Sequence, residues 1–315
     1  MFRILHDTKY DFIRWWRTAA GLTIAFIVIG IGSIFVRGGF DYSVEFTGGT
    51  LMQLHFNAPP EQGKIRAALD AGGIKDEEVT TFGSPSDFTI RARSDSTSAS
   101  ADSASRKIEG LLVTGFGRDA FKVVRTEAVG SKVGSELARG AIIAILVSFF
   151  VTLVYLAIRF DWRFGISATI ATMHDILTTV AFMKIIHLEI SLTVIAALLT
   201  VIGYSLNDTI IIFDRVRENL RKNRREPLYN TLNRSVNETL PRSILTHATA
   251  LAATLALLFF AGEVIRPFAW VMAFGIITGT FSSIYVASPI LLWIETKYPR
   301  ENTAKTSKAA KASPA

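Results

Sequence analysis

Two acidic side chains and one lysine lie inside long apolar runs of the sequence. Asp175 lies in the middle of the run 164–186, Asp208 lies in the second half of the run 190–213, and Lys184 lies one turn from the end of the first run. A charge at the centre of a membrane helix costs about 2.5 to 3.5 kcal/mol, so it usually has a partner or a function. The two acids are therefore candidates for proton transfer, whereas Lys184 is close enough to the helix end to reach the lipid headgroups.

Asp208 belongs to a polar stretch, residues 203–209, within otherwise apolar sequence. In a helix its side chain shares one face with Ser205, Ile212 and Arg215, because residues three or four positions apart stack on the same side. This hydrophilic strip is predicted to point into a bundle of helices.

Arg242 is the predicted counter-ion of Asp208. It begins another apolar run, and at helical spacing it is followed by Thr246, Thr249 and Ala253. A carboxyl group in a low-dielectric site holds its proton more tightly, whereas a nearby guanidinium favours the carboxylate. Movement of Arg242 relative to Asp208 would therefore switch the acid between holding and releasing a proton. Three polar residues are expected to orient the pair or its water: Asn207, Ser205 and Thr246.

Other chemistries fit these residues less well. A metal site would have to use His174, Asp175 and His247, which lie on two runs without ligand spacing such as His-x-x-x-His. An intramembrane aspartyl protease would need Tyr-Asp and Gly-x-Gly-Asp, whereas the two acids follow a histidine and an asparagine. The sequence also lacks cysteine, a phosphate-binding glycine loop and a Ser/His/Asp order. It therefore predicts no enzyme, no metal and no cofactor.

The composition indicates that the elements holding these residues are membrane helices. Half of the 315 residues are apolar, only 19% are charged, and the mean hydropathy is +0.34, which leaves too little polar surface for a soluble globule of this size. Six runs approach the roughly 20 residues that a helix needs to cross the hydrocarbon core: 18–36, 140–158, 164–186, 190–213, 243–261 and 267–294. The predicted fold class is a polytopic α-helical membrane protein with six transmembrane helices.

The distribution of charge predicts the orientation. With both termini in the cytoplasm, the cytoplasmic parts hold 19 Lys and Arg against 9 Asp and Glu, whereas the outer parts hold 14 against 16. Basic residues are enriched on the cytoplasmic side of membrane proteins. We therefore expect a cytoplasmic N-terminus at 1–17, a basic cytoplasmic loop at 214–242 and a disordered cytoplasmic tail at 295–315. The net charge of +7 does not indicate nucleic acid, because no basic stripe with interleaved aromatics lies outside the loops.

Residues 37–139, between the first two spans, are predicted to fold as one exterior domain. Alternating apolar residues indicate strands at 51–56, 79–82, 88–93 and 121–126. One helical stretch follows Pro59-Pro60, and another carries Ile108 and Leu112 after a Ser-rich stretch at 94–105. The order strand, helix, strand, strand, helix, strand is that of the ferredoxin-like α+β fold.

The last run has a small residue at every fourth position. The stripe is formed by Gly275, Gly279, Ser283 and Ala287. Small residues let another helix approach closely. The partner helix can lie in this chain or in another.

Four motifs resemble those of the SecD/SecF family of bacterial protein-export membrane proteins, and in particular its smaller member. The longest is GYSLNDTIIIFDRVREN at 203–219, and the others are EFTGG at 45–49, HD at 174–175 and NRSVNETLPR at 233–242. The resemblance extends over about residues 12–294. By position in the motifs, Asp208 and Arg242 match the family's essential aspartate and arginine. His247 departs from the family pattern, in which a small hydroxyl residue is expected.

The resemblance implies a function and a set of partners. It implies membership of the resistance-nodulation-division superfamily, a SecD partner, association with the SecYEG translocon and with YajC and YidC, and use of the proton-motive force to pull or release exported polypeptide. The location it implies is the bacterial inner membrane, with the exterior domain in the periplasm. Asp175 is expected to support helix packing or the proton relay. Two rival functions remain: a proton-coupled half-transporter of small molecules or lipids, and a passive membrane assembly subunit.

Overall fold

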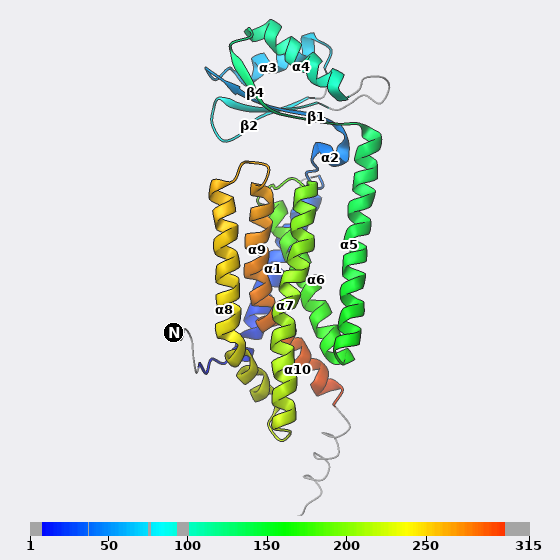
Figure 1. The fold of residues 1–315 in the computed structure, drawn as a ribbon, viewed down its shortest axis with the longest axis vertical. Helices are drawn as coiled ribbons and strands as arrows, with labels where there is room; N and C mark the ends of the chain where they lie inside the picture. Colours follow the sequence, from blue (N-terminus) through cyan, green and yellow to red (C-terminus); the bar gives the residue numbers. More distant parts are fainter. Residues whose placement is uncertain (1–7, 37, 75–76, 93–100, 300–315) are drawn as a thin grey trace, which may run out of the picture. The chain divides into compact units, whose positions relative to one another are not determined.

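The computed structural model describes residues 8–36, 38–74, 77–92 and 101–299, which form two compact units (Figure 1). The helical bundle comprises Met1–Phe40, Ile145–Leu188 and Thr193–Ala315. The α/β domain comprises Asp41–Ala144 and Glu189–Leu192. Residues 93–100 of the Ser-rich stretch and 300–315 of the expected disordered tail lie outside the described residues.

Six helical runs in the described part of the chain are long and apolar enough to cross a membrane. A 3₁₀ turn, Ile13–Trp15, leads into α1 (Trp16–Val36). Four long helices follow the α/β strands: α5 (Ser131–Arg159), α6 (Trp162–Ile185), α7 (Leu192–Lys222) and α8 (Leu228–Phe260). The last run joins α9 (Arg266–Ser282), a π-helical segment (Ser283–Ala287) and α10 (Ser288–Lys297). The prediction of six transmembrane helices is confirmed.

The segment expected to be a basic loop is mostly helical. Helix α7 continues to Lys222 and α8 begins at Leu228, so only residues 223–227 form the turn between them. With 31 residues, α7 is about 46 Å long, well beyond the roughly 30 Å of hydrocarbon. Glu218 accepts from Arg215 and from Lys222 on this extension, each at 2.6 Å. Such ion pairs, three and four residues apart, stabilise a helix that has left the lipid.

The small-residue stripe packs within this chain. A Cβ added at Gly279 of α9 would lie 3.0 Å from the Cβ of Ser205 on α7, and one added at Gly275 would meet the side chain of Val201 at 2.3 Å. The absence of side chains at these two glycines therefore lets α9 approach α7 closely. This approach brings the hydroxyl residues of the two helices into contact.

The α/β domain has the predicted ferredoxin-like fold. Its elements are β1 (Gly49–Phe56), α3 (Gln62–Ala71), β2 (Glu78–Thr81), β3 (Asp87–Ala92), α4 (Ala101–Phe116) and β4 (Phe121–Val129), after a short helix α2 (Val44–Thr47). The antiparallel sheet has the strand order β2-β3-β1-β4. Its apolar face packs with both helices in one core, which includes Met52, Leu54, Ile65, Leu69, Ile90 and Ile108.

The segment before α1 is held against the N-terminal part of α8. The amide of Asn237 accepts from the Tyr10 backbone N–H at 2.9 Å and donates to its carbonyl at 2.8 Å. Asn233 accepts from the N–H of Ile13 at 3.1 Å and donates to Asp11 at 2.8 Å. The motif 233–242 therefore supplies two asparagines that satisfy backbone groups at the start of the first membrane run.

Candidate functional site

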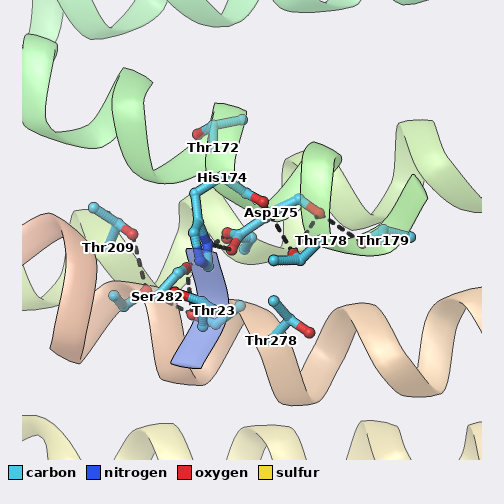
Figure 2. Close-up of polar contacts among 12 residues, drawn as sticks. Thr23, Thr172, His174, Asp175, Thr178, Thr179, Thr209, Thr278 and Ser282 are labelled. Atoms are coloured by element: carbon cyan, nitrogen blue, oxygen red, sulfur yellow. Dashed lines mark hydrogen bonds and ion pairs between the residues drawn. The ribbon is translucent and has the colours of Figure 1, made fainter. Parts of the chain in front are cut away.

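Asp175 lies at the centre of a hydrogen-bond network between three helices. Its side chain on α6 is 1% exposed. One carboxylate oxygen accepts from Ser205 Oγ on α7 and from Ser282 Oγ on α9, the latter at 2.7 Å. The other oxygen lies 3.1 Å from His174 Nδ1. Figure 2 shows this carboxylate directed at Ser282, and the contacts join α6, α7 and α9 through one side chain.

Hydroxyl side chains surround this carboxylate. Thr178 and Thr179 return hydrogen bonds to the backbone of α6, including the Asp175 carbonyl, at 3.1 and 2.7 Å (Figure 2). Thr209 of α7 and Ser283 bridge two helices at 2.9 Å. Ser283 begins the π-helical segment, and Ser288 Oγ donates to its carbonyl at 3.0 Å. These hydrogen bonds supply the partners that buried polar groups need in a low-dielectric bundle.

Asp208 is buried with fewer partners. Its side chain on α7 is 2% exposed, and one carboxylate oxygen accepts from Ser243 Oγ on α8. Its other oxygen, Oδ2, is buried without a hydrogen-bond partner in the described part of the chain. A buried carboxylate oxygen without a donor is costly, so this position is the natural place for a proton or a cationic group.

One buried face of α7 carries Asp208 and also contacts Asp175 of α6. Ser205, which donates to Asp175, is three residues before Asp208, and both are 2% exposed. Ser205, Asp208 and Ile212 of the face predicted from the sequence are buried, whereas Arg215, the last residue of that face, is partly exposed. Ser205 is therefore a direct contact of Asp175, whereas we had expected it beside Asp208.

Arg242 forms no ion pair with Asp208 among the described residues, and its side chain is exposed. The next residue of α8, Ser243, contacts Asp208 instead. Successive residues of a helix point about 100° apart, so Arg242 and Ser243 cannot both face α7. The other residues of the face predicted for Arg242, namely Thr246, Thr249 and Ala253, are also exposed.

Of the remaining residues that the sequence singled out, some are exposed and others are buried in the bundle. Asn207 is exposed on α7 and lies away from the buried carboxylates. Thr246 contributes its carbonyl, which accepts from the Tyr204 hydroxyl at 3.1 Å. His247, 8% exposed, lies against the Tyr204 ring at a centroid distance of 5.2 Å. Lys184 is 3% exposed. Its side chain is therefore buried in the bundle, whereas the sequence predicted that it reaches the lipid headgroups.

The sequence did not identify Ser243 and Ser282, the residues that donate to the two carboxylates. Serine is common in membrane helices, and only its partner distinguishes it. The only signal in the sequence for either serine was the small-residue stripe, because Ser282 directly precedes Ser283 of that stripe. Within the described residues, no three metal-ligating side chains gather. The arrangement can therefore hold or transfer protons between oxygen and nitrogen atoms of side chains.

The fold and the site define a multi-pass membrane protein with a ferredoxin-like domain and two carboxylates buried in its helical bundle. A family model described as the C-terminal part of the protein export membrane proteins SecD and SecF matches residues 112–297. A second model, the SecD/SecF GG motif, matches residues 32–60. The protein translocase subunit SecF of Gemmatimonas aurantiaca is 60% identical over 99% of this chain and 95% of its own length. That of Vibrio alginolyticus is 40% identical, covering 93% and 92%.

The chain belongs to the SecF family of protein translocase subunits, as its motifs predicted. A crystal structure of SecDF from Thermus thermophilus, described as a translocon-associated membrane protein, has a TM-score of 0.83 and 34% identity over 94% of this chain. This chain spans only 40% of the length of that SecDF chain.

Proposed function

We propose that this chain acts with SecD in the bacterial inner membrane, where it couples the proton-motive force to polypeptide translocation. The observation that carries the proposal is the buried Asp208 carboxylate, one oxygen of which has no hydrogen-bond partner in the described residues. An ionisable group held in this way inside a membrane bundle is a functional-site candidate. Because the chain belongs to a family of protein translocase subunits, we infer that the proton exchange is coupled to polypeptide translocation.

In this proposal, Asp208 exchanges a proton while α8 changes the group that faces it. The contact with Ser243 corresponds to one state. A rotation of α8 by about 100° would bring Arg242 to the same position, because the two residues are neighbours in the helix. A guanidinium there would favour the carboxylate and release the proton, whereas Ser243 allows the protonated acid. Asp175 accepts from donors on three helices and so holds α6, α7 and α9 together. These three helices stay fixed while α8 rotates.

The available energy suits this movement. Each proton that enters down roughly 100 mV releases about 2.3 kcal/mol, and each pH unit of gradient adds about 1.4 kcal/mol. Together these contributions are enough to change the equilibrium constant between two conformations by a factor of several hundred. In this proposal the α/β domain lies in the periplasm, which the charge distribution favours, and carries the movement to the exported polypeptide.

The exposed face of α7 and α8 supports SecD as the partner in the membrane. Arg242 and Asn207 are polar side chains on this face, and lipid is a poor surrounding for them. Gly203 of α7 and Ala253 of α8 are also exposed, and such small residues favour a closely packed helix from another chain. SecYEG, YajC and YidC are further partners in the proposal, in which both termini lie in the cytoplasm, as the distribution of Lys and Arg predicts.

Asp208→Asn tests the proton role directly. In vesicles reconstituted with SecD and the translocon, we expect this variant to reduce export to the level measured without a proton gradient. Asparagine keeps the size and polarity of the side chain but cannot exchange a proton. The matched control is Asp70→Asn, an exposed acid of the α/β domain, which should leave export unchanged. Full gradient-dependent export by Asp208→Asn would show that the assignment is wrong.

The same assay separates the two rivals. Export stimulation that survives collapse of the proton gradient would favour a passive assembly subunit. Gradient-driven uptake of a small apolar solute by this chain with SecD, without export, would favour a half-transporter.

A further inference from the structure

The end of α5 and the extension of α7 form a cleft of about 390 Å³ lined by both basic and acidic residues. Its lining residues are Arg159, Asp214, Arg217, Glu218, Arg221 and Lys222. Four cations and two carboxylates give the lining a net positive charge. All six residues lie within the helical bundle, and all but Arg159 belong to the segment 214–242 that the sequence predicted as a basic cytoplasmic loop.

Two of the guanidinium groups are held side by side. Asp214 bridges them, with Oδ2 accepting from Arg159 at 2.7 Å and Oδ1 from Arg217 at 3.3 Å. Both groups also lie over the buried Phe160 ring, each 5.4 Å from its centroid. Neither contact uses all five N–H donors of an arginine. Two adjacent arginines with free donors match the oxygen atoms of a phosphate group.

Arg221 adds a third cation on the same side of α7, four residues after Arg217. It is exposed and has no acidic partner in the described ranges of the chain. Lys222 is engaged with Glu218 at 2.6 Å. The cleft therefore has one unpaired cation beside two guanidinium groups fixed by Asp214, and its charge complements an anion.

The surroundings indicate a membrane surface at this level. Arg159 ends the apolar helix α5, whose outward side chains include Val151 and Ile158, 58% and 83% exposed. Trp162, 51% exposed, follows directly and contacts Tyr298 with ring centroids 6.0 Å apart. Exposed tryptophan and tyrosine at the end of a span are typical of the headgroup region.

We propose that this cleft binds the phosphate of an anionic phospholipid headgroup, with Arg159 and Arg217 as a paired fork and Arg221 as the third contact. The acyl chains would lie along the exposed apolar face of α5. The phosphate of a lipid and free inorganic phosphate offer the same oxygen atoms, and the position of the cleft at the end of a lipid-facing helix favours the lipid.

The test measures how strongly the purified full chain prefers phosphatidylglycerol over phosphatidylcholine, by native mass spectrometry from detergent. We expect the double variant Arg217→Gln/Arg221→Gln to reduce this preference by about 25-fold, since each basic residue near a membrane surface contributes about fivefold. Arg221→Gln alone, which removes no contact within the described residues, should reduce it by about fivefold. The matched control Arg224→Gln/Arg225→Gln removes two exposed charges and should change the preference less than about twofold, because neither residue lines the cleft and solvent screens them from an anion bound in it.

Three outcomes would overturn the proposal. An equal loss in the control pair would show a general attraction to the basic surface rather than a site. Displacement of phosphatidylglycerol by inorganic phosphate at equal concentration would show a small-anion site. Retention of the lipid preference by Arg221→Gln and by the double variant, with unchanged thermal unfolding, would equally reject the cleft.

Discussion

The two buried aspartates differ in how fully they are hydrogen-bonded. Asp175 has donors from α7 and α9 and a histidine on its own helix. Asp208 accepts one hydrogen bond, from Ser243 of α8, and its other oxygen accepts none in the described residues, although Ser283 and His247 lie close to the carboxylate. A fully bonded buried carboxylate stabilises one arrangement of its helices, whereas a partly bonded one is more easily changed. The pattern of donors is therefore the structural reason why the proposed function gives proton exchange to Asp208 and helix packing to Asp175.

A third aspartate, Asp87 of the α/β domain, predicts a pH dependence outside the membrane. Hydrogen bonds from Ser84, at 2.6 Å, and from His55, at 2.6 Å, lower the pKa of Asp87 below its ordinary value of 3.8. The carboxylate therefore stabilises the folded domain in full above about pH 4, and this stabilisation is lost as the pH falls through the lowered pKa.

We expect Asp87→Asn to remove that part of the acid sensitivity. Hydrogen exchange of the β1 and β3 amides in the full chain, corrected for intrinsic rates, should show less loss of protection between about pH 5 and pH 3 than in the natural protein. Asp70→Asn, at an exposed position, serves as the control and should retain the natural profile. Identical pH profiles for Asp87→Asn and the natural protein would contradict the assignment.

At the scale of the element, contacts between helix backbones decide the packing of the bundle. A Cβ added at Gly30 of α1 would lie 2.3 Å from the Cβ and 2.6 Å from the Cα of Ala181 on α6. Alanine has no other rotamer, so the helices themselves would have to separate. Gly32, two residues further along the same helix, has nothing within 4 Å of an added Cβ.

Gly30→Ala should therefore destabilise the protein by about 1 to 3 kcal/mol, the usual cost of overpacking. Gly32→Ala should be neutral or slightly stabilising, because alanine favours the helix. Thermal unfolding of both variants in the same detergent measures the difference. Equal unfolding temperatures would mean that α1 and α6 do not pack as closely as the glycine contact indicates.

At the scale of the whole molecule, one face of the bundle carries side chains that do not suit lipid. Arg242, Thr246 and Thr249 of α8 and Asn207 of α7 are exposed on it. The helices that present this face already use their other sides for the buried acids. The face is therefore available for another membrane chain, which the proposed function identifies as SecD.

The absence of cysteine in the sequence makes a cross-linking test clean. A photoactivatable maleimide on Thr249→Cys should cross-link to co-expressed SecD in membranes. The matched position is Val151→Cys on α5, 58% exposed on an apolar helix, and it should give little or no product. Equal cross-linking at both positions, or product at Val151 alone, would place the partner elsewhere.

The sequence by itself determined the six spans, the ferredoxin-like order and the two acids, because these follow from local periodicity and from the cost of burying a charge. It determined less about helix ends: 214–222 are polar, yet ion pairs along the chain keep them helical beyond the lipid.

Only the tertiary structure decided which side chains meet. The rotation of α8 places Ser243 at Asp208 and turns Arg242 outward, and a difference of one residue in a helix changes direction by about 100°. The close approach of α9 to α7 at Gly279 likewise brings Ser282 to Asp175. Such contacts depend on distances between helices, and periodicity along one helix contains no information about its neighbour.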